Sequence, residues 1–590
     1  MVGEICMKVN DLSVMVGGEA GAGITRAGYL FAKACMRGGM HAFGTNDYQS
    51  LIRGGHNFYV AWIRENEVYS QADLVDLLLA LNAETIALHK DEMASGGGII
   101  YDPEDTPDPK QAAGRGDLKF YPIPLKRIVT EDLKQDLISR NTVALGAAMK
   151  IVDYDFAMLE EVLGDTFSDK AAATSIAAAR KGYDYAHQNF PDDFGCHLSK
   201  TRSSGKTKIF LTGNESIGTA AIAAGCKLYV AYPMTPVSGL LTFMAEKERN
   251  YKMIVFHPEG EIAALIMAAG ASFAGVRAMT STSGGGFCLM TEGLGMTGMT
   301  ETPVVIAMGI RNGPSTGLPT YTSQGDLRFV LHASQGEFPR VVVAPGDIDE
   351  CFYETMMAFN WAEKYQLPAI LLVDKYLVES QMSVTPFDPE RIGIERGELD
   401  IIDRYAGAEE YKRHRITETG VSPRLIPSTM GAIIRTNSDE HDESGYTTER
   451  PDLTVKMMEK RMRKLEYLER ELVEKEIETT RLFGQEDADA TIIGWGSTKG
   501  PIREAMRILS KEGISVNYRQ IVYLHPFPIK VLEDTLKNAK KTVIVENSFT
   551  SQLSGLIRQY TLRDVDSKIL KYDGRPWNPD SLAQKIKGVL

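Results

Sequence analysis

Tyr232-Pro-Met-Thr-Pro-Val-Ser238 is the stretch of sequence that decides the fold, because it follows an apolar segment at residues 228–231 that is typical of a buried strand. Prolines on either side of Met234 and Thr235 restrict the backbone at low entropic cost. A strand that ends in such a turn can hold one hydroxyl group in a fixed position. Since ligands of parallel sheets bind at the carboxyl ends of the strands, we expect Thr235 to face a ligand.

The region from residue 208 to about 387 alternates apolar, strand-like runs with helical segments. Strands are expected at residues 209–211, 228–231, 253–256, 304–308, 341–344 and 369–373. This alternation predicts an α/β domain with a mostly parallel sheet that helices cover on both faces. The turns that begin at Tyr232, His257 and Arg311 follow three of these strands, so we expect them to share one rim of the sheet.

A candidate acid opens the helix after the second of these turns, His257-Pro-Glu-Gly-Glu261. Pro258 suits the first position of a helix, and Glu261 follows three residues later. Leu265 and Ala268 lie on the same helical face, which places the Glu261 carboxyl among apolar side chains. An acidic residue is also favourable in any first helical turn, and that effect is sufficient to explain Glu259.

Two glycine-rich turns complete the set, Thr282-Ser-Gly-Gly-Gly-Phe287 and Arg311-Asn-Gly-Pro-Ser-Thr-Gly-Leu-Pro-Thr320. Arg311 offers planar, bidentate donors that suit a carboxylate. Each turn alone could be structural. In this order, the turns and Glu261 indicate half of a thiamine diphosphate site, because that cofactor needs a carboxyl group positioned on its aminopyrimidine ring.

The other half of such a site is missing from the sequence. Thiamine enzymes hold the diphosphate and its Mg²⁺ through a Gly-Asp-Gly motif and a later Asn, whose oxygen atoms Mg²⁺ prefers. No Gly-Asp-Gly occurs anywhere in the chain. We therefore expect this chain to supply the pyrimidine side and a partner chain to supply the rest.

The N-terminal segment, residues 1–200, has a Rossmann-like pattern. An apolar strand runs into Gly17-Gly-Glu-Ala-Gly-Ala-Gly23 and a helix follows from Ile24, an arrangement that suits phosphate. A second loop, Gln49-Ser-Leu-Ile-Arg53-Gly-Gly55, brings an arginine and two glycines together. Tight structural turns explain both loops equally well.

The remaining boundaries follow from composition. A pyrimidine-binding domain is expected over residues 201–387, after a polar linker near residues 191–206. Residues 388–485 combine an irregular segment with an amphipathic helix at residues 455–481. Its apolar stripe is Met458, Met462, Leu465, Leu468 and Leu472. A third small α/β domain is expected over residues 486–590.

Size and charge limit the classes of protein. A chain of 590 residues is too long for one core and suggests three or four domains. The net charge of −13 argues against nucleic acid as a partner, because phosphates require clustered Lys and Arg. The first residues lack the basic region and apolar core of a signal peptide, and no apolar run is long enough to span a membrane. We expect a cytoplasmic protein.

The cysteines give little sign of a metal centre. The chain has 6 cysteines, widely scattered and without a C-x-x-C pair. Iron–sulfur clusters and structural zinc usually need closely spaced thiolates. We therefore predict no metal site in this chain, and buried or incidental thiols in a reducing compartment.

Residues 208–380 resemble the pyrimidine-binding domain of the 2-oxoacid:ferredoxin oxidoreductases, specifically of their alpha subunit. The matching motifs are Tyr232-Pro-Met-Thr-Pro-Val-Ser238, Glu261-Ile-Ala-Ala264, Gly313 to Thr320, Gln324-Gly-Asp-Leu327 and Gly336-Glu-Phe-Pro-Arg340. Residues 1–200 resemble the family's gamma domain, fused ahead of alpha, and the last segment resembles its transketolase-like C-terminal domain. Met234, Val237 and Gly285 depart from the family's usual residues.

The resemblance implies roles for individual residues. It makes Glu261 the cofactor activator, Thr235 and Arg311 contacts for the carboxylate of a 2-oxoacid, and Tyr232 and Pro233 cofactor contacts. It also suggests that Gly21, Gly23 and Arg53 form a coenzyme A or domain-contact loop.

The resemblance also implies an assembly and a reaction. A beta subunit would carry Gly-Asp-Gly, Mg²⁺ and a [4Fe-4S] cluster in an alpha2beta2 enzyme. The reaction would be reversible, coenzyme A-dependent oxidative decarboxylation of a 2-oxoacid, with electrons passing to ferredoxin. Among substrates, 2-oxoglutarate is favoured, because the fused arrangement with the Asp439-Glu-His-Asp-Glu443 segment resembles 2-oxoglutarate-type members.

Alternatives remain open at this stage. Pyruvate or a broad range of 2-oxoacids is a close alternative for the substrate. A dehydrogenase that binds NAD through the Gly17–Gly23 turn is an alternative of another class, but it leaves Thr235, Glu261 and Arg311 unexplained. A scaffold subunit without chemistry of its own is the third alternative.

Overall fold

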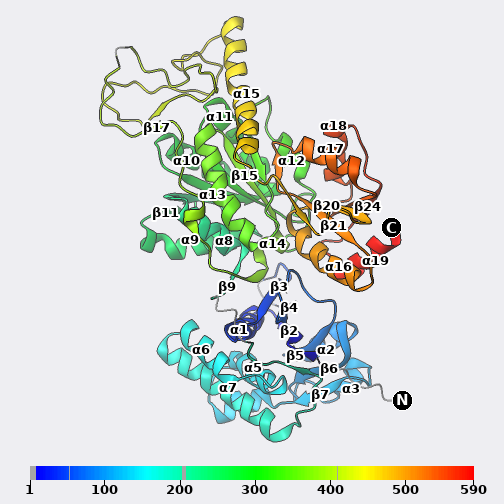
Figure 1. The fold of residues 1–590 in the computed structure, drawn as a ribbon. Helices are drawn as coiled ribbons and strands as arrows, with labels where there is room; N and C mark the ends of the chain where they lie inside the picture. The colour runs from blue at the N-terminus through cyan, green and yellow to red at the C-terminus, as the bar shows by residue number, and fades with distance from the viewer. Residues whose placement is uncertain (1–7, 52–53, 202–206, 408) are drawn as a thin grey trace. The chain divides into compact units, whose positions relative to one another are not determined.

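The computed structural model describes residues 8–51, 54–201, 207–407 and 409–590. The chain divides into two compact units (Figure 1). The first unit contains Met1–Leu211, Ser380–Pro386 and Asn578–Leu582. The second contains Thr212–Glu379, Phe387–Trp577 and Ala583–Leu590. Arg53 and Cys6 of the sequence analysis lie outside the described residues.

The first unit is built on an eight-stranded sheet in the order β7-β6-β5-β2-β4-β3-β16-β9. The strands are β2 (Asp11–Glu19), β3 (His41–Asp47), β4 (His56–Arg64), β5 (Val75–Ala80), β6 (Met93–Tyr101), β7 (Lys119–Pro122), β9 (Ile209–Thr212) and β16 (Gln381–Val384). Strands β2, β5, β6 and β7 pair in parallel, whereas β4 pairs antiparallel with both β2 and β3. The unit is therefore an α/β fold with a mixed sheet.

Helices of the first unit bury one continuous core against this sheet. They include α1 (Ile24–Arg37), α5 (Arg140–Ile151), α6 (Phe156–Thr166) and α7 (Asp169–Asn189). The sequence predicts a turn from Gly17, but β2 continues through Gly17 and Gly18 to Glu19, so the turn before α1 comprises residues 20–23. The N-cap of α1 is Gly23 in the left-handed conformation, at φ 73°, which glycine adopts without strain.

The second unit contains the predicted parallel sheet, in the order β11-β10-β12-β13-β15-β14-β22. Its strands are β10 (Leu228–Val230), β11 (Ile254–Phe256), β12 (Ala278–Ser283), β13 (Val304–Ile310), β14 (Val341–Val343), β15 (Pro368–Asp374) and β22 (Tyr523–His525). All neighbours pair in parallel except β22, which lies antiparallel to β14 at one edge. Because β22 comes from the C-terminal segment, it adds an antiparallel edge to an otherwise parallel sheet.

Helices cover both faces of this sheet, as expected for parallel strands. All seven residues of β13 are buried, and they alternate between two cores. Val305 and Ala307 face the core shared with α8 (Gly213–Ala223), α9 (Ser238–Tyr251) and α13 (Ile348–Tyr365). Ile306 and Met308 face the core shared with α10 (Glu261–Phe273) and α11 (Gly284–Met299).

The C-terminal segment forms the expected further α/β layer, a five-stranded sheet in the order β19-β21-β20-β23-β24. These strands are β19 (Thr480–Phe483), β20 (Ala490–Trp495), β21 (Val516–Ile521), β23 (Thr542–Glu546) and β24 (Ser567–Leu570). Helices α16 (Lys499–Lys511), α18 (Gln552–Thr561) and α19 (Pro579–Val589) follow strands of this sheet, and α17 (Ile529–Asn538) follows β22 of the seven-stranded sheet. Buried Gln324 joins it to the seven-stranded sheet, donating to the Trp495 carbonyl at 2.8 Å and accepting from the Asn547 N–H at 2.8 Å.

Residues 388–450 are largely irregular, as predicted, and lie beside α15 (Pro451–Glu474) (Figure 1). The helix begins earlier than the predicted residue 455, because Pro451 occupies its first turn, where a missing N–H costs nothing. Of the predicted apolar stripe, Leu468 and Leu472 are buried, whereas Met458, Met462 and Leu465 are only partly buried. Lys460 and Lys464, both fully buried, form ion pairs with buried Glu301, which also bonds His414 at 3.0 Å.

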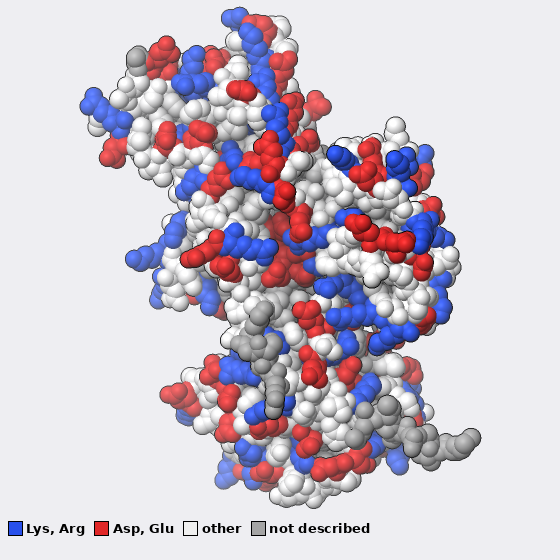
Figure 2. All heavy atoms as spheres, in the orientation of Figure 1, with Lys and Arg blue, Asp and Glu red and all other residues white. Residues whose placement is uncertain are grey.

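Basic and acidic side chains are mixed over the face that Figure 2 shows, including the surface of α15. Such mixing gives no continuous basic stripe on this face for a nucleic acid. Within the described residues, no helix combines the length and apolar character that a membrane span requires.

Candidate functional site

Four neighbouring strands of the second unit end at one rim of the sheet. The order β11-β10-β12-β13 places the turns after these strands side by side. These turns carry Thr235, Glu261, the Gly284–Gly286 run and Arg311. The rim predicted from sequence is therefore present, and it carries the expected acid, hydroxyl and guanidinium groups.

Glu261 is the first residue of α10 and is only 5% exposed. The helix does not include Pro258, because Gly260 is fully extended and ends the turn directly before Glu261. The Glu261 carboxyl rests on the start of α11, where a Cβ on Gly286 would come within 2.6 Å of its Oε1. Among the described residues, no side chain or backbone group forms a hydrogen bond with this carboxyl. Glu261 is thus a buried acid available to a ligand.

Thr235 and Arg311 meet at the same rim. The Arg311 guanidinium donates from Nη1 to the Thr235 carbonyl at 3.2 Å. Burial lowers the pKa of Arg311, while Asp326 opposes that effect. In the part of the chain that the structure describes, Arg311 forms no ion pair with a carboxylate. Its charge is therefore available to an acidic ligand.

Asn214 holds the Tyr232–Ser238 turn through a hydrogen bond to its backbone. It was not among the site residues predicted from the sequence. This residue lies in the first turn of α8, whose start Thr212 and Glu215 fix as a capping box. Its Nδ2 donates to the Pro236 carbonyl at 3.0 Å. The capping-box pattern, Thr followed by Glu three residues later, was the signal in the sequence that could have located it.

The Arg311–Thr320 loop closes on itself. Asn312 and Leu318 form an antiparallel bridge, and the Leu318 N–H donates to the Asn312 carbonyl at 2.8 Å. Gly317 allows this closure, because its φ is +50° and a Cβ there would lie 2.1 Å from the Asn312 carbonyl oxygen. Leu318 therefore lies next to Asn312, so the end of the loop comes back close to Arg311 at the rim.

Asp326 is a further acid at this rim, and the sequence analysis placed it only within a motif. Its Oδ2 would lie 2.6 Å from a Cβ on Gly284, the first residue of α11. Burial raises the pKa of Asp326 to about 6, against the opposing effect of the Arg311 guanidinium. The sequence could not reveal this position, because α12 (Leu327–His332) begins far along the chain from Gly284.

The other predicted contacts are more exposed. Tyr232 is 38% exposed and packs edge-on against His257, with ring centroids 5.6 Å apart. Pro233 is exposed beside it. Gly21 and Gly23 belong to the first unit, in the turn that precedes α1. A Cβ on Gly21 would meet no atom within 4 Å, so the backbone is open to approach there, whereas a Cβ on Gly23 would lie 2.4 Å from Asn141 Nδ2.

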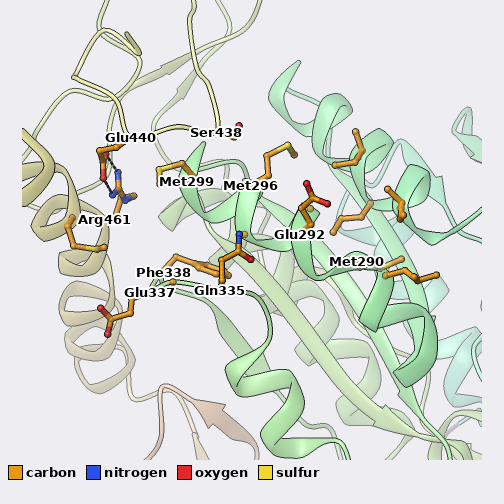
Figure 3. A pocket seen from close by; sticks show the side chains of 18 residues that line it. Met290, Glu292, Met296, Met299, Gln335, Glu337, Phe338, Ser438, Glu440 and Arg461 are labelled. Carbon is orange, nitrogen blue, oxygen red and sulfur yellow. Dashed lines mark hydrogen bonds and ion pairs between the residues drawn. The ribbon is translucent and has the colours of Figure 1, made fainter. Parts of the chain in front are cut away.

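An apolar surface continues from Glu261 along α10 and α11. Its exposed side chains are Ile262, Ile266, Met267 and Leu289. A pocket of about 600 Å³ opens in this surface. Figure 3 shows Met290, Met296, Met299 and Phe338 around it, with the Glu440–Arg461 ion pair at one side. Contiguous exposed apolar surface of this kind marks a protein interface or a ligand groove.

The described residues contain no cluster of His, Cys, Asp or Glu that could hold a metal ion. The five described cysteines are free thiols: Cys35, Cys196, Cys226, Cys288 and Cys351.

The donor set at the rim fits thiamine diphosphate from the pyrimidine side only. The Glu261 carboxyl lies buried without a protein partner, as a group that bonds the aminopyrimidine requires. The Thr235 hydroxyl and the Arg311 guanidinium can bind a carboxylate next to it.

The chain matches one family along nearly its whole length. Residues 219–460 match the model described as pyruvate flavodoxin/ferredoxin oxidoreductase, thiamine diP-bdg. Residues 13–185 match pyruvate ferredoxin/flavodoxin oxidoreductase, and residues 488–579 match pyruvate:ferredoxin oxidoreductase core domain II.

Two curated relatives are named as subunits of 2-oxoacid oxidoreductases. The 2-oxoacid:ferredoxin oxidoreductase 2, subunit alpha, of Aeropyrum pernix is 32% identical over 636 residues and covers 98% of both chains. The 2-oxoglutarate synthase subunit KorA of Methanocaldococcus jannaschii is 32% identical over 382 residues, which are 64% of this chain and 99% of the relative.

A solved structure extends the similarity to the fold. The 2-oxoglutarate:ferredoxin oxidoreductase from Magnetococcus marinus, with 2-oxoglutarate, coenzyme A and succinyl-CoA bound, matches with a TM-score of 0.88 and 31% identity. The match covers 98% of this chain and 99% of that chain. The rim that joins Glu261, Thr235 and Arg311 thus lies in the matched thiamine diphosphate-binding region, and the chain belongs to the 2-oxoacid:ferredoxin oxidoreductase family as an enzyme subunit of the alpha type.

Proposed function

We propose that this chain, together with a beta subunit, catalyses the oxidative decarboxylation of 2-oxoglutarate. The 2-oxoacid, coenzyme A and two oxidised ferredoxins give succinyl-CoA, carbon dioxide, one proton and two reduced ferredoxins. The single observation that carries the proposal is the rim of the parallel sheet, which carries buried Glu261 and the Arg311 guanidinium bonded to the Thr235 carbonyl; within the described residues Arg311 has no ion-pair partner.

Glu261 acts as the acid of the site. Its carboxyl would hydrogen-bond the pyrimidine ring of bound thiamine diphosphate, and the buried apolar side chains of α10 would keep water away from that contact. When bound, the cofactor supplies the nucleophile for the 2-oxo carbon and the electron sink for the loss of carbon dioxide. Tyr232 and Pro233 line the outer side of the same site.

Thr235 and Arg311 hold the substrate carboxylate. The Arg311 guanidinium donates a hydrogen bond to the Thr235 carbonyl. The Thr235 hydroxyl and the guanidinium therefore lie close enough to contact the same ligand. Thr235 follows β10 and Arg311 follows β13, so both belong to the rim that also carries Glu261, and the rigid sheet fixes where the carboxylate lies relative to Glu261. Such positioning is a large part of catalysis in enzymes that bring two reactants together.

The choice of 2-oxoglutarate rests on named relatives. The M. jannaschii protein is a 2-oxoglutarate synthase subunit, and a relative from Mycobacterium tuberculosis, 26% identical over 625 residues, is a 2-oxoglutarate oxidoreductase subunit. The matching M. marinus structure contains 2-oxoglutarate. A broad 2-oxoacid range is the second candidate, because the Aeropyrum pernix relative is named for 2-oxoacids in general.

A beta subunit completes the site in this proposal. It carries the Gly-Asp-Gly motif that this chain lacks, Mg²⁺ and the [4Fe-4S] cluster that passes electrons to ferredoxin. The apolar surface of Ile262, Ile266, Met267 and Leu289 runs directly from Glu261, so it is the surface on which that subunit would dock. An alpha2beta2 assembly is the proposed form.

The first unit supplies the coenzyme A contact in this proposal, through the Gly21 and Gly23 turn at the start of α1. A helix N-terminus attracts anionic groups such as the phosphates of coenzyme A. Arg53, in the predicted second loop, is outside the described residues. The division into residues 1–200, 201–387, 388–485 and 486–590 stays a prediction.

The proposed function is tested by co-expressing this chain with its beta subunit and measuring viologen reduction with 2-oxoglutarate, with pyruvate and without oxoacid. We expect reduction that requires both an oxoacid and coenzyme A, with a lower KM for 2-oxoglutarate than for pyruvate. The control is the same complex without coenzyme A. An intact complex, loaded with cluster and thiamine diphosphate, that reduces no viologen with any oxoacid would contradict the assignment.

Substitution E261Q should reduce kcat by at least about 100-fold, because the amide cannot hold the proton that the pyrimidine ring requires. The complex should still assemble, since Gln has nearly the shape of Glu. The measurement is viologen reduction together with size-exclusion chromatography of the complex. Activity within a few fold of the parent complex would argue against this role.

Substitution G286A provides a steric test of the same carboxyl. The new Cβ would lie 2.1 Å from Thr282 Oγ1 and 2.6 Å from Glu261 Oε1, so the acid must move. We expect kcat to fall by about 100-fold. The matched control is G285A, where a Cβ meets no atom within 4 Å and activity should be retained. Equal kcat values for the two variants would show that the position of Glu261 is not critical.

Substitution R311A should raise the KM for the oxoacid by about 10- to 100-fold, the effect of losing about 1.5–3 kcal/mol of charge-assisted hydrogen bonding. R311K should have an intermediate effect, because Lys keeps the charge without the bidentate geometry. The control is R450A, which removes an exposed arginine at the start of α15. An unchanged KM in R311A would exclude Arg311 as the carboxylate contact.

A further inference from the structure

Asp326 is the acid at the rim to which the proposed chemistry assigns no role. Its side chain occupies the N-cap position of α12, yet it makes no capping hydrogen bond there. Asp347, at the corresponding position of α13, does accept such a bond, from the Glu350 N–H at 2.9 Å. Among the described residues, the Asp326 carboxyl has neither a hydrogen bond nor an ion pair. Something other than helix capping must account for its orientation.

The carboxyl of Asp326 is directed instead onto the start of α11. Its Oδ2 fills the space where a Cβ on Gly284 would lie, at 2.6 Å. Glu261 occupies the corresponding space at Gly286, on the same helical turn. Two carboxyl groups therefore flank the N-terminus of α11, a 16-residue helix whose backbone N–H groups favour negative charge.

The chain segment that carries Asp326 is held firmly by the C-terminal sheet. Gln324, fully buried, bonds both the Trp495 carbonyl and the backbone N–H of Asn547. Gln552 Oε1 accepts from the Arg328 N–H at 2.8 Å, and the Gln552 amide donates to the Gly325 carbonyl. Because both flanks of Asp326 are fixed, its carboxyl cannot easily move away when a second negative charge enters the site.

The charged groups nearest to Asp326 include Arg311 at the end of β13, Glu261 at the start of α10 and Arg328 in α12, whose guanidinium lies near Gln559 and Gly555. Two further buried carboxyls lie on strands that bond the same loop: Asp374 at the end of β15 accepts from the Thr322 hydroxyl, and Glu546 at the end of β23 accepts from the Leu553 N–H. Burial raises the pKa of Asp374, and it raises the pKa of Glu546 to about 7. Within the described residues, Arg311 is the group that acts on the Asp326 carboxyl by charge. One guanidinium thus faces one carboxylate of the protein, and in the proposed function it must also take the carboxylate of the substrate.

We propose that Asp326 is a positioning residue that couples binding of the oxoacid carboxylate at Arg311 to the uptake of one proton from solvent. The inference rests on the proposed function. Without substrate, the charge of Arg311 favours the ionised form of Asp326 from beyond ion-pair distance. A substrate carboxylate at Arg311 repels it, and protonation of Asp326 removes that repulsion. Burial raises the pKa of Asp326 to about 6, which places this protonation close to neutral pH.

The direction of the pH dependence follows from this coupling. Protonated Asp326 favours the bound state, so the affinity for the oxoacid is highest below the pKa of the free enzyme, about 6. It falls as the pH rises above that value. Since one proton is taken up, KM can rise by at most about tenfold per pH unit. The carboxyl of a 2-oxoacid is ionised throughout this range and adds no titration of its own.

The kinetic test uses the alpha–beta complex and the isosteric variant D326N, which mimics the protonated acid. KM and kcat for the oxoacid are measured by viologen reduction from pH 6 to pH 9. We expect KM to rise with pH in the parent complex and to stay flat in D326N, with kcat similar in both. The control D452N removes an exposed carboxylate in the first turn of α15 and should keep the parental profile.

A binding measurement supplies a readout other than turnover. The 2-hydroxyacid that corresponds to the preferred oxoacid keeps the carboxylate but cannot be decarboxylated by this chemistry. Calorimetric titrations at pH 7 in two buffers of different ionisation enthalpy count the protons taken up on binding. We expect uptake that approaches one proton for the parent complex and none for D326N.

The outcomes separate the two proposals. A KM that keeps its pH dependence in D326N, or a proton uptake equal to that of the parent complex, overturns the role of Asp326 while leaving the proposed function intact. A D326N variant with reduced kcat and a parental KM profile assigns Asp326 a structural role and likewise overturns the coupling. A parent complex that reduces no viologen with any oxoacid overturns both proposals.

Discussion

Parallel pairing of β10, β11, β12 and β13 is the constraint on which the rest of the second unit depends. Helices cover both faces, so strands such as β12 and β13 are buried along their whole length. Their side chains must therefore pack as core, and groups with chemistry are displaced to the strand ends. Neighbouring strands lie about 4.8 Å apart, so the turns after these four strands bring their residues within reach of one ligand.

The start of α11 is the platform on which the site is assembled. Gly284 and Gly286 lack a Cβ at the two places where Asp326 and Glu261 approach most closely. Between them, Gly285 has open space and no such requirement. Two of the three glycines, Gly284 and Gly286, are therefore explained by two carboxyl groups that share one helical turn, whose backbone N–H groups favour both.

Two buried sets of polar contacts, around Gln324 and around Glu301, fix the segments that surround the parallel sheet. Gln324 links the loop before α12 to the C-terminal sheet through neutral hydrogen bonds. Glu301, which follows α11, holds α15 and the irregular segment through Lys460, Lys464 and His414. Burial lowers the pKa of Lys464 to about 7, against the attraction of Glu301. Because removal of one partner would leave buried charges uncompensated, these groups constrain where the segment lies.

The sequence by itself determined the local elements and most of the site. Apolar runs that alternate with helical segments predict the parallel sheet, and turns rich in Pro and Gly identify Thr235, Glu261 and Arg311 as residues at strand ends. These inferences succeed because side-chain periodicity and backbone restriction are local properties of the chain. The resemblance of its motifs to one family was confirmed along nearly the whole chain.

Only the tertiary structure decided the contacts between distant segments. The approach of Asp326 to Gly284, the support of Pro236 by Asn214 and the antiparallel pairing of β4 in the first unit join residues far apart in the chain. The buried face of α15 is a further example, since Lys460 and Lys464 read as solvent-exposed charges until Glu301 is placed against them. No local pattern encodes such pairs, because burial of a charge depends on the partner that packing brings to it.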